Sequence, residues 1–398
     1  MADRYTASVL FHREVSRAVE KAVALEKIKV YAVCCGSGGG LQRYLSSVPG
    51  SGGFLVGCSF PYATSETDRF LGFKPPDGYV SRSTAIHLAM QSYIKAAEHL
   101  ISQKRSGKET EKSPVGIGVT AAVATSRPLR GGYRAHLSVV TKNNVQACEY
   151  VLEDGVGLAA REMHSATCDI MALDSILATL GMQQFGTPLA LANVPQQEQR
   201  DLLFSRPLFT SWGGREEFTA KGGENIVFLS GSFNPLHDGH RNMAAAVEKA
   251  TGRKVIYNTT ADSVHKNWLT VTEMLTRAAQ VRVDHWNGHP YPILFTQNDP
   301  LFVDKIRLFP GANFAVGADT VARMLEPVWY PDGELGVQRM LDELRDGGAH
   351  FFVFGRQIGD RFMTMMDIRM HHSLLSMFTP IDGRWDISST EIRNGERR

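Results

Sequence analysis

One stretch, from Ile226 to Ala250, constrains the fold of this chain more than any other part of the sequence. It opens with an apolar run, Ile226–Ser230, that is rich in strand formers and about as long as a buried parallel strand. It closes with Met243–Ala250, whose apolar residues recur at helical spacing. Between them stands GSFNPLHDGH, residues 231–240. This order predicts an α/β domain in which the loop lies at the carboxyl end of a strand.

The loop has the chemistry of an anion-binding turn. Gly231 and Gly239 lack side chains where a phosphate would approach the backbone, and the following helix directs N–H groups and its positive dipole end toward that point. His237 and His240 are spaced so that their nitrogens can bond the oxygens of one phosphoryl group. The alternatives are a structural histidine pair or two zinc ligands, although zinc would require further Cys or His nearby. The pattern favours nucleotide binding.

Length and charge narrow the class of protein. The 398 residues allow two or three domains. A net charge of +2 indicates neither a nucleic-acid surface nor an acidic tail. The uncharged stretch between Tyr44 and Glu66 is interrupted by Pro49 and Pro61, so we expect no membrane helix there. The partners we expect are small nucleotides, neither nucleic acid nor a membrane, and a homo-oligomer stays open.

The termini and cysteines bear on localisation. The first residues, Met1–Tyr5, include an acidic side chain and precede no apolar run, so they do not resemble a secretory signal. The five cysteines are an odd number without metal-ligand spacing. We therefore expect a reducing compartment, the cytoplasm, with the nucleus left open.

The first half of the chain alternates strand and helix patterns, which predicts a layered α/β domain. A glycine-rich turn, residues 36–40, follows the first of its strands. We expect helices over 1–27, from 78–81 to 100 and over 156–180, and strands at 29–33, 53–60, 116–120 and 133–140.

Three segments of this half resemble the C-terminal domain of the competence-associated CinA proteins. They are SVPGSGGF (47–54), GYVSRSTAIHLAM (78–90) and the GGL of residues 39–41, and the resemblance covers about residues 8–180. The family includes nicotinamide mononucleotide deamidases, which work with a serine nucleophile and a lysine base. That resemblance implies a related domain here.

The working positions of that family are replaced in this chain. Gly36 stands at the nucleophile position, Thr67 at the lysine position and Gly157 at the position of an arginine. A hydroxyl without a neighbouring base is a poor nucleophile, so we expect the first domain to be inactive. The alternative is that Ser37 has taken over by a one-residue shift.

The join between the halves loses regular periodicity. Residues 181–224 contain Pro188, Pro195 and Pro207 and read as a linker, although Leu202–Phe204 is too apolar to be left in water. We therefore expect a first domain over 1–180, a linker over 181–224 and a second domain over 225–398.

The second half continues the α/β pattern with strands expected at 254–258, 293–296, 312–316 and 350–354. Gly317-Ala-Asp319-Thr320 places a carboxylate at the carboxyl end of one of them. Near the end of the chain, Ser388 and Glu391 have capping-box spacing, and the segment ISSTEIR (387–393) ends in Arg393. Hydroxyls and an arginine in this arrangement suit the outer phosphates of a nucleoside triphosphate. The alternative is an ordinary capped helix with a solvated arginine.

GSFNPLHDGH resembles the GxFxPxHxGH signature of the nucleotidylyltransferase superfamily, and ISSTEIR resembles its second signature. Together with Lys266, Arg277 and the GADT element, these segments most resemble nicotinamide or nicotinate mononucleotide adenylyltransferases. The resemblance implies a Rossmann-like domain with a parallel sheet. The alternatives are a cytidylyltransferase, a phosphopantetheine-type adenylyltransferase or a non-catalytic nucleotide-binding regulator.

The resemblance implies transfer of AMP from ATP, the co-substrate, to a mononucleotide phosphate with release of pyrophosphate. Mg²⁺ would be held by the phosphates and water, with no metal site built from protein ligands alone. Trp268, Trp286, Trp329 and Tyr330 are candidates for stacking on a base or as core residues. The implied catalytic residues are His237, His240, Lys266 and Arg393. The implied nucleotide-binding residues are Gly231, Ser232, Phe233, Gly317, Asp319, Ser388, Ser389 and Thr390.

Overall fold

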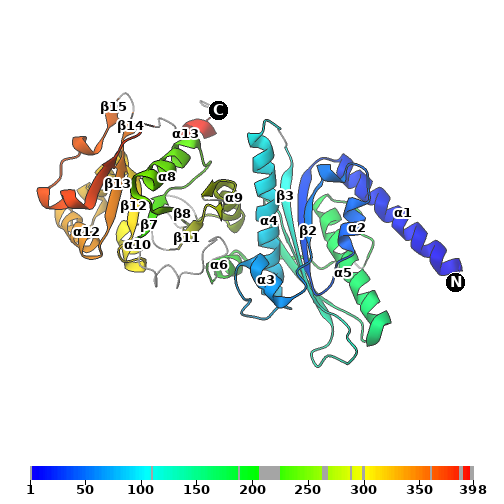
Figure 1. Ribbon diagram of the computed structural model, residues 1–398. Helices are drawn as coiled ribbons and strands as arrows, with labels where there is room; N and C mark the ends of the chain where they lie inside the picture. The colour runs from blue at the N-terminus through cyan, green and yellow to red at the C-terminus, as the bar shows by residue number, and fades with distance from the viewer. Residues whose placement is uncertain are drawn as a thin grey trace. The chain divides into compact units, whose positions relative to one another are not determined.

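The structure is a computed structural model of the chain. It describes residues 2–108, 111–186, 189–205, 225–261, 268–286, 289–297, 301–358, 361–384 and 389–394. The chain divides into two compact units (Figure 1). The first comprises Met1–Leu208 with Thr270–Ala279, and the second comprises Phe209–Leu269 with Gln280–Arg398.

The first unit is a mixed six-stranded sheet with helices on both faces. Its sheet has the order β2-β1-β3-β4-β5-β6, in which β2, β1 and β3 are parallel and the remaining neighbours antiparallel. Figure 1 shows α4 on one face and α1, α2 and α5 on the other. The elements are α1 (Ala2–Ala24), β1 (Ile28–Cys35), α2 (Leu41–Ser46), η1 (Ser51–Gly53), β2 (Leu55–Ser59), α3 (Thr64–Leu71), α4 (Arg82–Arg105), β3 (Ser113–Ala122), β4 (Arg134–Val140), β5 (Val145–Val151), α5 (Gly157–Thr179), β6 (Ala192–Asn193) and α6 (Gln196–Ser205).

Helix α4 lies unusually close to strand β3 because two strand residues are glycines. A Cβ atom on Gly116 would come within 2.2 Å of the carbonyl oxygen of Ala89, and one on Gly118 within 2.3 Å of that of Ala85. Ser81 caps this helix, since its Oγ accepts the backbone N–H of Thr84 at 3.2 Å. The helix backbone therefore packs directly on the strand.

Several elements of the first unit were not predicted from the sequence, among them α2, α3, β5 and α6. Strand β5 was not predicted, and it forms because its residues pair along the whole edge of β4. Helix α6 lies inside the segment predicted as a linker, and Leu203 on it is buried. The carbonyl oxygen of Leu202 lies 3.2 Å from Nε2 of His87 on α4. Residues 206–224 of that segment lie outside the described residues.

The second unit is a parallel six-stranded sheet. Every neighbouring pair in the order β11-β8-β7-β12-β13-β16 is parallel. Two short hairpins, β9-β10 and β14-β15, are added to it. The elements are β7 (Ile226–Ser230), α8 (Asp238–Thr251), β8 (Lys254–Thr260), β9 (His285–Trp286), β10 (His289–Pro290), β11 (Ile293–Thr296), α10 (Phe302–Leu308), β12 (Asn313–Gly317), α11 (Ala318–Met324), η3 (Pro327–Trp329), α12 (Glu334–Asp346), β13 (His350–Phe354), β14 (Arg356–Ile358), β15 (Arg361–Met363), η4 (Met365–Asp367), η5 (His372–Met377), β16 (Phe378–Ile381) and α13 (Ser389–Arg393). Helix α9 (Val271–Arg282) is divided between the units, with residues up to Ala279 grouped with the first.

The strand order of the second unit is that of a doubly wound dinucleotide-binding fold. Numbered along the chain, its main strands run 3-2-1-4-5-6 across the sheet. The order reverses between β7 and β12, and ligands of such sheets bind outside the carboxyl ends of the strands at that point. The prediction of a Rossmann-like α/β fold with a parallel sheet is confirmed. The predicted signature loop follows β7, at the reversal.

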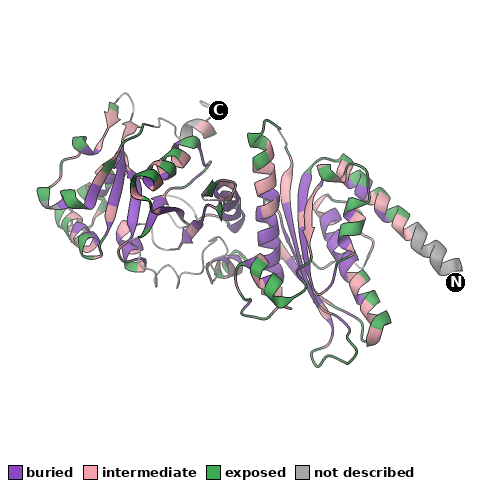
Figure 2. Cartoon of the chain, viewed as in Figure 1, coloured by how far each residue is buried: buried purple, intermediate pink, exposed green. Residues whose placement is uncertain are grey.

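Stacked aromatic rings hold the centre of this sheet together. The rings of Phe314 and Phe351 on neighbouring strands lie 5.3 Å apart, and those of Phe351 and Phe378 lie 5.1 Å apart. Such cross-strand ring pairs stabilise a sheet by roughly 0.5–1 kcal/mol each. Figure 2 shows the strands as buried and the outer sides of the helices as exposed.

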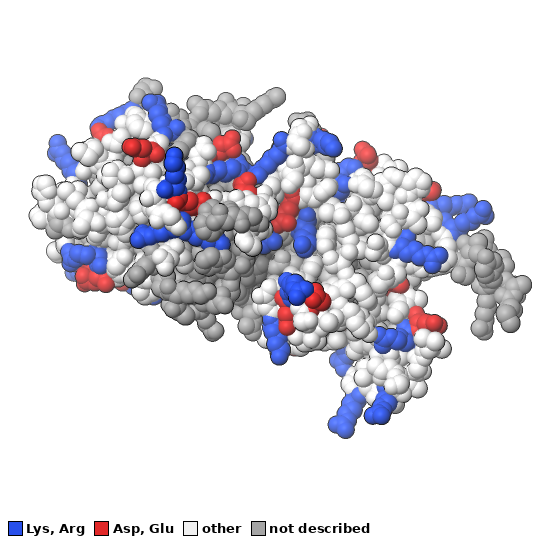
Figure 3. All heavy atoms as spheres, viewed as in Figure 1, with Lys and Arg blue, Asp and Glu red and all other residues white. Residues whose placement is uncertain are grey.

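The surface carries charged side chains of both signs (Figure 3). On the face drawn in Figure 3, lysine and arginine side chains are intermingled with aspartate and glutamate. Within the described parts of the chain, no helix combines the length and the hydrophobicity needed to cross a membrane.

Candidate functional site

The loop between β7 and α8 is fixed by backbone and ring contacts. The N–H of Gly231 donates to the carbonyl oxygen of Asn258 at 3.0 Å, and the carbonyl oxygen of Gly231 accepts Oγ1 of Thr259 at 2.9 Å. The ring of Phe233 is fully buried, edge-on to the rings of His240 and Tyr257. A Cβ atom on Gly231 would lie 2.8 Å from the ring of Phe233, so glycine is needed there.

The two predicted histidines lie side by side at the start of α8. His237 is the N-cap residue, and its ring centroid lies 3.8 Å from that of His240, with 28° between the planes. The backbone N–H of His237 donates to Nδ1 of His240 at 3.4 Å. In the neutral ring the hydrogen of His240 is therefore on Nε2, which makes Nε2 a hydrogen-bond donor.

The charge state of His240 is set by its surroundings. Burial, together with the positive charges of His237, Arg356 and Arg241, lowers the pKa of His240 to about 3. At neutral pH His240 is thus an uncharged N–H donor. A phosphate arriving beside it would offset those positive charges.

The C-terminal helix α13 lies against the same loop. Oγ of Ser389 donates to the carbonyl oxygen of Pro235 at 3.1 Å, and Nη1 of Arg393 donates to the carbonyl oxygen of Asn234. These pairs are separated by 154 and 159 positions in the sequence. The fold therefore brings together the two segments that the sequence analysis placed around one triphosphate.

Several predicted residues are not described in full. Lys266 and Ser388 lie outside the described residues, as does the side chain of Thr390, whose backbone is in α13. Ser232 is exposed on the loop. Their predicted roles stay predictions.

The GADT element lies after β12, beside the loop of β7. Gly317 is the N-cap residue of α11, and a Cβ atom there would lie 2.4 Å from Oδ1 of Asp319. Oδ2 of Asp319 accepts Nη2 of Arg323 at 2.7 Å. Among the described residues, no three His, Cys, Asp or Glu side chains are grouped closely enough to hold a metal ion.

The structure adds two cations that the sequence analysis did not assign to the site. Arg356 lies two residues after the end of β13 and begins β14, and its Cβ lies 3.9 Å from where a Cβ of Gly317 would be. Lys305 on α10 is buried, and its Nζ donates to Oγ of Ser230 at 3.2 Å. The position of Arg356 shortly after a strand could have predicted its place at the carboxyl edge of the sheet. The position of Lys305 within a helix gives no such indication.

Other residues singled out in the sequence lie elsewhere. Arg277 is 7% exposed and belongs to the stretch grouped with the first unit. Trp329 is half exposed, with Nε1 donating to Glu326, and the hydroxyl of Tyr330 donates to the carbonyl oxygen of Met324. Trp268 is partly buried, and the side chain of Trp286 is not described.

In the first unit, Ser37 sits in a buried cluster of hydroxyl and thiol groups. Its side chain is 2% exposed, and its Oγ donates to Oγ of Ser165 at 3.0 Å. Burial raises the pKa of the neighbouring Cys168 thiol to about 12, so that thiol is no base. On the same helix, Nδ1 of His164 accepts the N–H of Ala124 and Nε2 contacts the carbonyl oxygen of Glu153. The histidine is therefore engaged away from Ser37.

The other two family positions also lack their working groups. Oγ1 of Thr67 donates to the carbonyl oxygen of Pro61 at 3.3 Å, where the family resemblance placed a lysine. Gly157 begins α5, and Arg161, one turn later, donates to the carbonyl oxygen of Ala124 and to the hydroxyl of Tyr62, each within 2.9 Å. Arg161 thus places a guanidinium near Tyr62, although the arginine position of the family is occupied by Gly157 in this chain.

Asp169 fills the glycine-rich turn of the first unit. Its Oδ1 accepts the N–H of Leu41 at 2.9 Å, and its Oδ2 lies 2.3 Å from where a Cβ of Gly40 would be. Burial raises the pKa of Asp169 to about 6, against the opposing effect of the N–H groups of Leu41 and Gly40. Backbone N–H groups at this turn are therefore already bonded to a carboxylate of the same unit.

Solved structures give low similarity. The competence/damage inducible protein CihA from Agrobacterium tumefaciens is 19% identical, with a TM-score of 0.32, over 42% of this chain and 93% of its own. A CinA superfamily protein from Klebsiella pneumoniae is 11% identical, with a TM-score of 0.31, over 43% of this chain and 97% of its own. A CinA superfamily protein from Escherichia coli is 12% identical, with a TM-score of 0.30, over 42% of this chain and 90% of its own. Curated proteins give no match.

The family comparison concerns the second unit. Residues 228–395 match the family model described as Cytidylyltransferase-like. This range contains the paired histidines, the GADT element and α13. The part of the chain that holds the candidate site is therefore similar to cytidylyltransferase-like proteins, and the similarity supports a nucleotidyltransferase.

Proposed function

We propose that the second unit is an adenylyltransferase that transfers AMP from ATP to a mononucleotide phosphate, nicotinamide or nicotinate mononucleotide, and releases pyrophosphate. The observation that carries this proposal is the contact between α13 and the loop of β7, through Ser389 and Arg393. The choice of a pyridine mononucleotide rests on the resemblance of the GADT and SSTEIR segments.

The chemistry is an in-line displacement at phosphorus. An oxygen of the acceptor phosphate attacks the α-phosphorus of ATP, a new P–O bond forms, and the bond to the β-phosphate oxygen breaks to release pyrophosphate. No covalent intermediate with the protein is needed. Catalysis then depends on positioning and on donors directed at oxygens that gain charge.

The described residues fit that task. Nε2–H of His240 would donate to an α-phosphoryl oxygen, and His237 beside it would contact the triphosphate. Arg393 would hold the departing pyrophosphate, with Ser389 fixing α13 on the loop. Arg356, whose charge acts on His240, would add positive charge at the same edge. Mg²⁺ bound through the phosphates would neutralise part of their charge.

A pyrophosphate-release assay tests the proposal. The full chain is given ATP or CTP with nicotinamide mononucleotide, nicotinate mononucleotide, choline phosphate or phosphopantetheine. We expect release with ATP and a pyridine mononucleotide. Preference for CTP and choline phosphate would instead identify a cytidylyltransferase. No release with any pair, together with calorimetric binding of ATP, would identify a nucleotide-binding regulator and refute the enzyme.

We further propose that the first unit is catalytically silent. The support is the absence of a lysine or histidine side chain bonded to Ser37 among the described residues, and the carboxylate of Asp169 in the glycine turn. Ammonia production from nicotinamide mononucleotide by the full chain, abolished in Ser37→Ala, would overturn this.

A further inference from the structure

The second unit has a hollow at the edge of its sheet opposite the candidate site. It lies where β12 and β13 begin, at Asn313 and His350, and beside the turn from α8 to β8. The signature loop, by contrast, follows the carboxyl end of β7. Because β12 has five residues, the two edges are separated by roughly 15 Å. The hollow is therefore distinct from the candidate nucleotide site.

Glycine turns help to form the hollow. Gly311 and Gly348, which precede β12 and β13, both have positive φ, +77° and +73°. A Cβ atom on Gly348 would lie 3.4 Å from Cα of Gly311, so the two turns meet without side chains between them. The resulting volume, about 550 Å³, is within the usual range for small-molecule sites.

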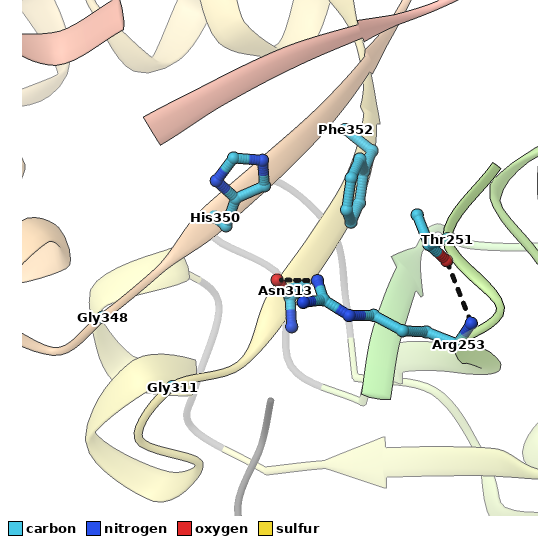
Figure 4. A pocket seen from close by; sticks show the side chains of 7 residues that line it. All are labelled: Thr251, Arg253, Gly311, Asn313, Gly348, His350 and Phe352. Carbon is cyan, nitrogen blue, oxygen red and sulfur yellow. Dashed lines mark hydrogen bonds between the residues drawn. The ribbon is translucent and has the colours of Figure 1, made fainter. Parts of the chain in front are cut away.

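Arg253 supplies the charge of the hollow (Figure 4). Its Nη1 donates to Oδ1 of Asn313 at 2.8 Å, and its guanidinium lies 5.9 Å from the centre of the Phe352 ring. These contacts fix the plane of the guanidinium. A guanidinium has five N–H groups, and within the described residues Arg253 makes no other side-chain hydrogen bond or ion pair.

His350 adds a second polar group to the same wall. Its Nε2 lies 2.9 Å from Oγ1 of Thr379, and its ring packs edge-on against Phe352 at 5.0 Å. Burial and the charge of Arg253 lower the pKa of His350, so the imidazole is neutral beside the guanidinium. An anion bound to Arg253 would offset its positive charge and so raise the pKa of His350 again.

The side chains around the hollow select for negative charge. Its lining combines one cation, one imidazole, one amide, one hydroxyl and one aromatic ring, and none of the described lining residues is acidic. A guanidinium held by an amide and an aromatic ring is pre-organised to bind a carboxylate or phosphate with two parallel N–H bonds. A cation in a concave, partly apolar site binds an oxyanion more strongly than an exposed one does.

We propose that the hollow lined by Arg253, His350 and Phe352 is a second ligand site, which binds the carboxylate or phosphate group of a small molecule. Arg253 forms the bidentate contact, Asn313 holds the guanidinium, and the Phe352 ring supports its face. This site does not depend on the proposed adenylyl transfer, because none of its residues is near the loop of β7.

The test uses the full chain with ¹³C-labelled histidine, followed by proton–carbon correlation spectra. The signals of His350 are identified by their loss in His350→Gln. Inorganic phosphate and benzoate are titrated separately, so that the phosphate and carboxylate sources are distinguished. We expect saturable shifts of the His350 signals with at least one of them. No shift of these signals with either anion would overturn the proposal.

Arg253→Gln keeps an amide that can reach Asn313 but removes the charge, so it should weaken the binding about tenfold or more. Arg339→Gln removes an exposed arginine of α12 that forms an ion pair with Asp332; this variant is the matched control and should bind like the wild type. Equal binding by Arg253→Gln and the wild type would contradict the proposal. If Arg253→Gln does not fold, Arg253→Lys gives the same test: it lacks the planar fork, so unchanged affinity would equally contradict a bidentate contact.

Discussion

His240 is the residue whose substitution tests the proposed mechanism most directly. Its Nδ1 is engaged by the backbone N–H of His237, so Nε2 is the atom left to donate to a phosphoryl oxygen. Its pKa of about 3 makes it neutral throughout the physiological range. His240→Ala therefore removes one neutral donor and no net charge.

The size of the expected effect follows from this geometry. A hydrogen bond to a charged oxygen in a buried site contributes roughly 1.5–3 kcal/mol, and removal of one donor to a developing oxyanion costs about 10² to 10³ in turnover. Because a neutral donor contributes less to the ground state than to the charged transition state, kcat and kcat/KM should fall by similar factors. The fold should persist, since the ring is not in the central sheet.

The assay is pyrophosphate release at pH 7.5 with saturating ATP and the preferred acceptor. His289→Ala, which removes an exposed histidine from β10 in the same unit, is the control and should keep wild-type turnover. Thermal melting of both variants checks folding. Wild-type turnover in His240→Ala would remove His240 from the mechanism, as would an equal loss in both variants.

Three further predictions concern stability. Unfolded histidine takes up a proton near pH 6.5, whereas folded His240 does so only near pH 3. The free energy of unfolding of the second unit should therefore fall by up to about 1.4 kcal/mol for each pH unit as the pH is lowered from 6.5 to 3. Denaturant unfolding of the wild type and of His240→Asn at pH 7 and pH 5 measures this loss. The effect of pH through Asp169 is the opposite, because its folded pKa, about 6, is higher than the unfolded value of 3.8. The first unit should therefore become more stable as the pH falls from 6 to 4, and Asp169→Asn should remove that gain. Gly118→Ala should destabilise the first unit by about 3 kcal/mol in the same measurement, because its Cβ would overlap the carbonyl oxygen of Ala85; wild-type stability would contradict the close packing of α4.

Local sequence patterns predicted most of the parallel sheet. Short apolar runs with the length and composition of buried strands are sufficient to place β7, β8, β12 and β13. The position of a residue directly after such a strand then places it at the carboxyl edge, which is how Gly317 and Asp319 were assigned to the crevice. The same rule places Arg356, two residues after the end of β13, at that edge.

Other features depend on contacts that local patterns do not contain. Lys305 reaches Ser230 from a helix 75 positions further along the chain, and its helical spacing gives no sign of that contact. Helix α6 carries few apolar residues, and its Leu203 is buried only because the fold places other elements around it. The pairing of β5 with β4 likewise depends on a neighbouring edge and not on its own sequence.

Two glycine-bearing turns of this chain, those after β1 and β7, show why such contacts decide function. Each follows a strand and precedes a helix, and each has the local composition of a phosphate-binding turn. In the first unit the carboxylate of Asp169, 128 positions away, accepts the N–H of Leu41 and occupies the space beside Gly40. A phosphate at that point would meet a buried carboxylate, and the repulsion between two anions in a low dielectric opposes its binding. In the second unit the turn of β7 instead has His237, Arg356 and Arg393 near it, all of which favour an anion. The distant side chains that reach each turn, and not its glycines, therefore separate the proposed catalytic unit from the proposed silent one.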